Sequence, residues 1–127
     1  MRRYKSVLIV DDDEDVREEI SDLLSFEGHP NVVAADGVAA LAALERCETP
    51  TLVLLDDLMP RMNGAEFLDR LSRLESPRNI QVVFMSGYAE PILGARGALD
   101  EGVVLVSKPF SETELLTKIR DALDAPR

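Results

Sequence analysis

The sequence predicts an α/β domain in which helices cover both faces of a parallel, doubly wound sheet. Three observations lead to this fold class. Short apolar runs of strand length recur along the chain, segments with apolar residues at helical spacing separate them, and the two kinds of segment alternate throughout. Five strands that alternate with five helices require crossover connections, which are right-handed in almost every known parallel sheet.

Five apolar runs have the composition of buried strands. The fourth and fifth are continuous rather than alternating, as is typical of strands that are covered on both faces. The third run ends on a carboxylate, and a turn follows it at Pro60 and Asn63-Gly64. The expected strands are Ser6–Val10, Asn31–Ala35, Leu52–Asp56, Ile80–Met85 and Val103–Val106.

The segments between these runs have helical periodicity. The first carries apolar residues at positions i, i+4, i+7 and i+8, and Gly28 is expected to end it. The last begins with Ser111 followed by Glu114, which is the pattern of a capping box. The segment Pro91–Leu99 is the weakest, because it contains two glycines. The expected helices are Asp15–Phe26, Gly37–Cys47, Gly64–Arg73, Pro91–Leu99 and Ser111–Leu123.

Length and composition restrict the function. Residues 1–127 are enough for one domain with one core, and the net charge of −10 disfavours direct binding to nucleic acid. Cys47 is the single cysteine, so no intrachain disulfide can form, and a reducing cytoplasm is the default location. The apolar runs are far shorter than a membrane span, and no signal-peptide segment follows the first residues, so we expect no membrane association.

Polar residues follow four of the five expected strands. Asp11 and Asp12 follow the first strand, Asp56 ends the third, and Ser86 and Lys108 follow the fourth and fifth. Because ligands of such sheets bind at the carboxyl ends of the strands, we expect these side chains to converge. Carboxylates, a hydroxyl and an ammonium together suit a divalent cation, preferably Mg²⁺, and a phosphoryl group. We therefore interpret Asp56 as a nucleophile.

Four motifs in order, VLIVDDDED, LVLLDDLMPRMNG, FMSG and VSKPF, resemble those of a known family. The chain is similar over essentially its whole length to the receiver domain of two-component response regulators, of the CheY type. The resemblance implies a single receiver domain, a flavodoxin-like strand order of 2-1-3-4-5 and five flanking helices. It also implies a signalling role in place of an enzymatic one.

The resemblance assigns a role to each polar residue of the predicted site. It makes Asp56 the phosphoryl acceptor, since Asp56 precedes Pro60 by four residues in the D-x-x-M-P pattern. The Mg²⁺ ligands would be Asp12, with Asp11 assisting, Asp56 itself and the backbone carbonyl of Leu58. The phosphoryl group would be contacted by two further side chains, Ser86 and Lys108.

The resemblance also implies partners and an output. The phosphoryl donor would be a histidine kinase or a histidine phosphotransfer protein, and an unidentified effector would read the phosphorylated state. We expect the switching surface to be built from Pro91–Leu99, the fifth strand and the last helix. The motifs alone cannot tell a free-standing receiver from one that belongs to a longer regulator or hybrid kinase.

The chain departs from the usual family pattern in three places. Leu105 occupies the position of the aromatic switch residue, so the usual aromatic rotation cannot occur. Asp57 follows the acceptor, but strand alternation directs it elsewhere. Leu58 and Tyr88 occupy positions that tune dephosphorylation, and we expect their bulk to restrict attacking water and to lengthen the phosphorylated lifetime.

Other interpretations explain less of the sequence. Asp11, Asp13 and Asp15 resemble the opening of a calcium loop, but its sixth position is Val16, where glycine is needed. A phosphatase of the haloacid-dehalogenase type needs an aspartate where this chain has Leu58. A pseudo-receiver without phosphorylation would not need the complete set of polar residues. His29 is expected to be an exposed loop residue.

Overall fold

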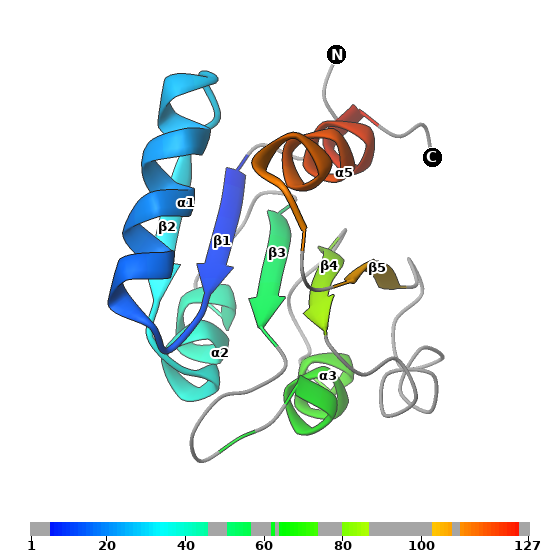
Figure 1. The fold of residues 1–127 in the computed structure, drawn as a ribbon. Helices are drawn as coiled ribbons and strands as arrows, with labels where there is room; N and C mark the ends of the chain where they lie inside the picture. The colour runs from blue at the N-terminus through cyan, green and yellow to red at the C-terminus, as the bar shows by residue number, and fades with distance from the viewer. Residues whose placement is uncertain are drawn as a thin grey trace.

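The computed structural model describes residues 6–45, 51–56, 62, 64–73, 80–86, 103–107 and 110–124. Within them lie five strands and four helices (Figure 1). The strands are β1 (Ser6–Val10), β2 (Asn31–Ala34), β3 (Thr51–Asp56), β4 (Ile80–Ser86) and β5 (Val103–Ser107). The helices are α1 (Glu14–Phe26), α2 (Gly37–Glu45), α3 (Gly64–Ser72) and α5 (Glu112–Asp124).

The strands form one parallel sheet in the order β2-β1-β3-β4-β5, which confirms the predicted strand order. The order reverses direction between β1 and β3, and the carboxyl ends of these two central strands are adjacent at that point. Ligand sites of open α/β sheets form at this kind of reversal. The fold therefore supports a ligand site at the carboxyl edge of the sheet, where the sequence places its carboxylates.

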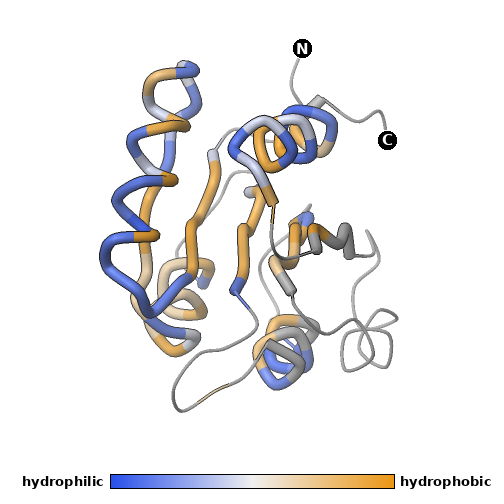
Figure 2. Tube along the Cα trace, viewed as in Figure 1, coloured by the Kyte–Doolittle hydropathy of each residue, from blue (hydrophilic) through white to orange (hydrophobic). Residues whose placement is uncertain are grey.

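Helices cover both faces of the sheet. Figures 1 and 2 show α1 and α5 on one face and α2 and α3 on the other, with apolar residues along the strands between them. Because successive side chains of a strand point to opposite faces of the sheet, the core has one part on each face. Leu8, Val53 and Val82 pack with the α2 and α3 side, whereas Val7, Leu54 and Val83 pack with the α1 and α5 side.

The boundaries differ from the sequence prediction by one or two residues. Helix α1 starts at Glu14 because Asp13 is its N-cap, with its side chain accepting hydrogen bonds from the backbone N–H groups of Asp15 and Val16. Strand β4 extends to Ser86 and β5 to Ser107. The expected helix Pro91–Leu99 lies outside the described residues. The capping box of α5 is confirmed, since the backbone N–H of Ser111 and that of Glu114 each donate to the other residue's side chain, at 3.3 and 3.0 Å.

The end of α1 corrects the prediction for His29. Gly28 adopts φ +82°, its N–H donates to the carbonyl of Ser25, and the N–H of His29 donates to the carbonyl of Leu24. This pair of bonds is a Schellman motif, which turns the residue after the glycine back against the helix. His29 is therefore buried, with 5% of its surface exposed, and the expectation of an exposed loop residue was wrong.

No helix in the described part of the chain has the length and apolar character that crossing a membrane requires.

Candidate functional site

Two aspartates lie side by side at the carboxyl edge of the sheet. Strands β1 and β3 pair in a register that sets Val10 beside Leu55, so the next residues, Asp11 and Asp56, are also neighbours. Each directly follows an apolar strand residue, and both are buried, with 4% and 5% of their surfaces exposed. Two short apolar strands thus deliver two carboxylates to the same point.

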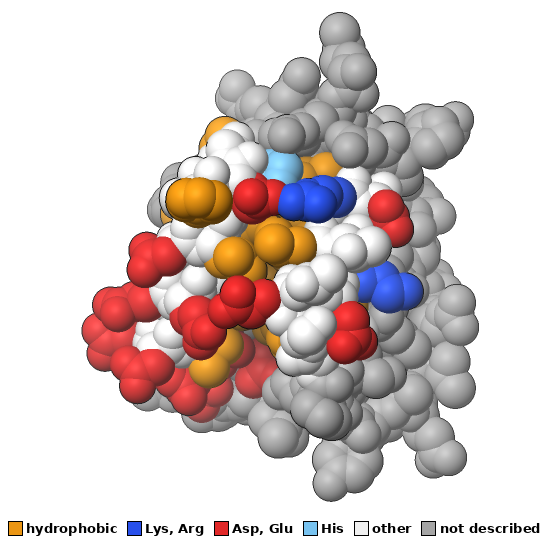
Figure 3. Space-filling model, turned by 45° about the horizontal axis from the view of Figure 1, so that its top comes forward, with side chains coloured by type: hydrophobic (Ala, Val, Ile, Leu, Met, Phe, Trp, Pro, Cys, Tyr) orange, Lys and Arg blue, Asp and Glu red, His pale blue; other side chains and the backbone are white. Residues whose placement is uncertain are grey.

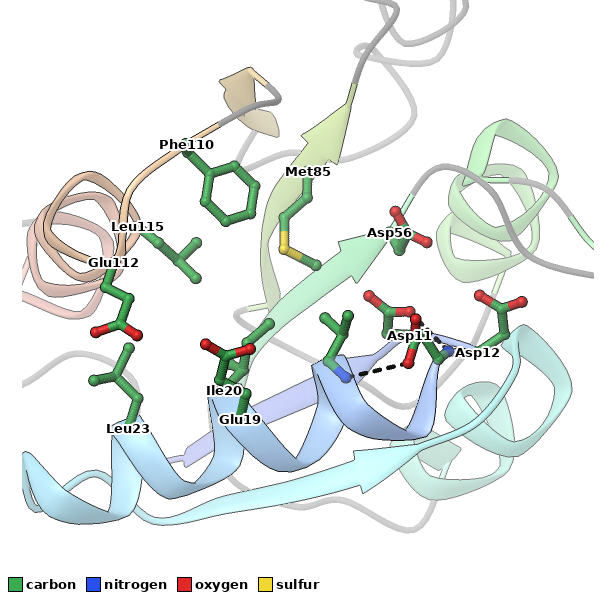
Figure 4. A pocket seen from close by; sticks show the side chains of 12 residues that line it. Asp11, Asp12, Glu19, Ile20, Leu23, Asp56, Met85, Phe110, Glu112 and Leu115 are labelled. Atoms are coloured by element: carbon green, nitrogen blue, oxygen red, sulfur yellow. Dashed lines mark hydrogen bonds between the residues drawn. The ribbon is translucent and has the colours of Figure 1, made fainter.

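Asp12 completes a cluster of three carboxylates. One side-chain oxygen from each of Asp11, Asp12 and Asp56 lies within 4.8 Å of the others, with Asp12 exposed (Figure 4). Carboxylates about 4 Å apart repel one another by about 4 kcal/mol at the effective dielectric constant of a protein surface. A cation held among the three oxygens would offset this repulsion, and oxygen ligands favour hard divalent cations.

Local hydrogen bonds fix the position of Asp11. Its side-chain oxygen Oδ1 accepts a hydrogen bond from the backbone N–H of Asp13 at 3.0 Å, and its backbone carbonyl accepts one from the guanidinium of Arg17 at 2.9 Å. The side chain of Asp13 points to the start of α1, where it accepts from Asp15 and Val16. Of the consecutive aspartates, two therefore face the cluster and the third caps the helix.

A cavity of about 840 Å³ opens from the carboxylate cluster along the α1 and α5 side of the sheet. Apolar side chains of α1, β4 and the start of α5 line it, with acidic residues at its rim (Figure 4). Figure 3 shows the same combination on the surface, where acidic side chains gather beside a band of apolar ones. The lining includes Val16, Ile20, Met85, Phe110, Leu115 and Glu112.

The remaining predicted site residues are placed only in part. Met85 pairs with Asp56 between β3 and β4, so the backbone of Ser86 lies one residue further along the same edge. Ser86 in turn pairs with Ser107, the residue directly before Lys108. Lys108, Leu58, Asp57 and Tyr88, and the side chains of Ser86 and Leu105, lie outside the described parts of the molecule.

Two contributors to the site were missed in the sequence. Asp13 was considered only as part of a calcium loop, although an aspartate directly before a helical segment is a recognised N-cap signal. Arg17 was not considered, and its contact with the Asp11 carbonyl depends on the turn between β1 and α1. No spacing rule in the sequence would have revealed that contact.

Comparisons with known proteins agree with this arrangement. Residues 7–120 match the model of the response regulator receiver domain. The chain is 33% identical over 117 residues to the transcriptional regulatory protein CpxR of Klebsiella pneumoniae, which covers 92% of this chain and 48% of that protein. It is 35% identical over 118 residues to the sensory transduction protein RegX3 of Mycobacterium tuberculosis, which covers 93% and 50%. The chain thus spans about half the length of these curated relatives.

Solved structures show the same likeness. The CheY-like receiver domain protein of Methanospirillum hungatei superposes with a TM-score of 0.77 at 27% identity, covering 93% of each chain. NtrX of Brucella abortus superposes with a TM-score of 0.74 at 29% identity, covering 93% of this chain and 27% of that one. Together with the match over residues 7–120, the paired aspartates and the strand order show that the chain belongs to the response regulator receiver domain family.

Proposed function

We propose that this receiver domain accepts a phosphoryl group on Asp56 and thereby changes its affinity for a partner. The observation that supports this proposal most strongly is the cluster of Asp11, Asp12 and Asp56 at the reversal point of the sheet. Phosphoryl acceptance is general to the family that the chain belongs to. The assignment of the acceptor to Asp56 rests on its place at the end of β3, beside the other two carboxylates.

The carboxylate cluster fits Mg²⁺. Ligands of one Mg²⁺ ion lie at about 2.1 Å from it, so two ligand oxygens are at most about 4.2 Å apart. The three oxygens lie within 4.8 Å of one another, close to this limit. Asp11, Asp12 and Asp56 would hold the ion, with the carbonyl of Leu58 as a further ligand. When bound, Mg²⁺ would neutralise charge on the transferring phosphoryl group.

The chemical step is a substitution at phosphorus. A carboxylate oxygen of Asp56 forms the new O–P bond, while the P–N bond to the donor histidine breaks and its electron pair stays on the imidazole. The product is an acyl phosphate. This species is labile, so its hydrolysis can return Asp56 to the free carboxylate. Ser86 and Lys108 would contact the phosphoryl oxygens by a hydroxyl hydrogen bond and by the charge of the ammonium.

The donor in this proposal is a histidine kinase or a histidine phosphotransfer protein in the cytoplasm, and residues 1–127 form one receiver domain. We propose that the switching surface comprises Pro91–Leu99, β5 and α5. Phosphorylation would shift the population between two conformations of that surface. The effector that reads the signal is not specified in this proposal, and the curated relatives CpxR and RegX3 are about twice as long as this chain.

The proposal is tested by intact-mass measurement after incubation with acetyl phosphate and Mg²⁺. The wild-type chain should gain the mass of one phosphoryl group, and Asp56→Asn should gain none. The same incubation with a chelator should leave the wild type unmodified. Continuous turnover of added phosphoesters, without a stable phosphorylated chain, would instead indicate a phosphatase and would contradict the proposal.

A further inference from the structure

The edge strand β2 exposes an uncharged, apolar surface. The large hydrophobic residues that are exposed in the described part of the chain are Phe26, Val32, Val33 and Val38, and two of them belong to this four-residue strand. Val32 and Val33 are 58% and 46% exposed. Edge strands of soluble proteins are usually protected by charged side chains, bulges or covering segments, and β2 shows no charged side chain of its own.

The absence of charge extends beyond the strand. The eight residues Gly28–Ala35 contain no Asp, Glu, Lys or Arg, in a chain of which 30% is charged and whose net charge is −10. Beside the strand, the uncharged side chains of Ser21 and Ser25 on α1 contact Asn31. Two copies of this acidic chain that met along β2 would therefore bring no charged side chains of the strand itself together.

Two backbone hydrogen bonds show which backbone groups of β2 face outward. The carbonyls of Pro30 and Ala34 accept hydrogen bonds from the N–H groups of Val7 and Asp11, so these residues turn toward β1 and its end. Backbone groups of successive strand residues alternate between the two sides of a strand. Val33 therefore directs its N–H and carbonyl away from β1, toward the open edge.

This arrangement is self-complementary under a two-fold axis. If two β2 strands pair antiparallel about Val33, the two Val33 residues form a hydrogen-bonded pair and exchange both N–H to carbonyl bonds. The flanking pairs in that register are Val32 with Ala34 and Asn31 with Ala35, which are small or uncharged. Such a contact is isologous, as closed dimers require.

We propose that β2 is a homodimerisation edge, through which two copies of this chain join their sheets by antiparallel pairing centred on Val33. The strand is short, so the interface belongs to the small, transient class. Screening of the two acidic chains by salt strengthens the dimer, because the Debye length falls from about 10 Å at 0.1 M to about 3 Å at 1 M salt. The inference does not depend on phosphorylation.

Sedimentation of the unphosphorylated, metal-free chain over a range of concentrations tests the inference. The wild type should show an average mass that rises with concentration and rises further at high salt. Val33→Pro removes the outward N–H without breaking a bond to β1, and Val33→Lys adds a charge at the centre of the contact. Each should raise the dimer dissociation constant by about tenfold or more.

Val38→Lys is the charge-matched control, since it introduces the same charge at a residue that is 56% exposed and belongs to α2, outside the paired strand. It should dimerise like the wild type. Hydrogen exchange gives an independent readout that needs no variant, because the Val33 amide should exchange more slowly as the dimer forms while the Val32 amide is protected in both states. A wild type that is monomeric at every concentration and salt, or an equal loss of dimer in the Val33 and Val38 variants, would overturn the inference.

Discussion

Asp11 and Asp56 are neighbours across two parallel strands, because Val10 pairs with Leu55 in the residue before each of them. The contact between these carboxylates is therefore a consequence of strand register, and not of loop conformation. A shift of one residue would turn one of the two side chains to the other face of the sheet. The apolar residues that fix the register thus also build the acidic site.

Removal of one metal ligand should weaken Mg²⁺ binding more than removal of a neighbouring charge. Asp12→Asn takes away a carboxylate oxygen of the cluster, and we expect Mg²⁺ affinity to fall by about tenfold or more. Asp13→Asn removes the same charge one residue away, where the side chain is exposed and caps α1. Its effect on affinity should be less than about threefold. Titration calorimetry with Mg²⁺ measures both, and equal losses in the two variants would contradict the assignment of Asp12.

The capping role of Asp13 predicts a separate effect on stability. Asp13→Ala leaves the N–H groups of Asp15 and Val16 without their side-chain acceptor and should lower the free energy of unfolding by about 1 kcal/mol. Asp13→Asn should retain most of that stability, because asparagine is an equally good N-cap. Urea unfolding measures the difference. An alanine variant as stable as the wild type would show that the cap contributes nothing.

Gly37 and Met62 are predicted to be energetically coupled. A Cβ atom at Gly37 would lie 2.7 Å from Sδ of Met62, which is buried with 4% of its surface exposed. Gly37→Ala should therefore destabilise the wild type by about 1–2 kcal/mol. In a Met62→Ala background Sδ and Cγ are removed, and the Cβ of residue 62 remains at an ordinary contact distance of 3.4 Å. There the same substitution should be neutral or slightly stabilising, since alanine favours the helix.

A double-mutant cycle measured by urea unfolding isolates this coupling, with an expected interaction energy above about 0.5 kcal/mol. If the cost of Gly37→Ala is the same in both backgrounds, the close approach of Met62 does not govern stability at α2.

The lifetime of the phosphorylated state should depend on Leu58 and Tyr88, which both lie outside the described residues. Smaller residues at the two positions should admit water and accelerate loss of phosphate from Asp56. The decay of intact phosphorylated mass after removal of the donor measures the rate. A decay rate unchanged in the double variant Leu58→Ala/Tyr88→Ala would reject this explanation.

Much of the fold and the central pair of carboxylates could be predicted from the sequence, because apolar runs of strand length end in aspartate and parallel strands share one carboxyl edge. The prediction failed for His29, whose burial depends on the left-handed turn at Gly28 and the two backbone bonds it permits. The sequence indicated where α1 would end, but not which side chain the turn would direct inward.

In the site, too, some features could be predicted from the sequence and others could not. The sequence predicted that Asp11 and Asp12 lie near Asp56, and the three oxygens do cluster. The sequence did not show that Asp13 has a different role from Asp11 and Asp12, because the identity of the N-cap depends on the exact first residue of α1. It also could not predict the contact between Arg17 and the Asp11 carbonyl, because that contact joins a flexible side chain to one backbone oxygen.

The central claim is that Asp56 is the acceptor within a single acidic site, and the most direct measurement is the location of the phosphoryl group. After reaction with acetyl phosphate and Mg²⁺, borohydride reduces an aspartyl phosphate to homoserine, and peptide sequencing by mass spectrometry identifies the altered residue. The account predicts homoserine at position 56 and unaltered aspartates at 11, 12 and 57. Homoserine at Asp12 or Asp57 with an unaltered Asp56 would contradict it.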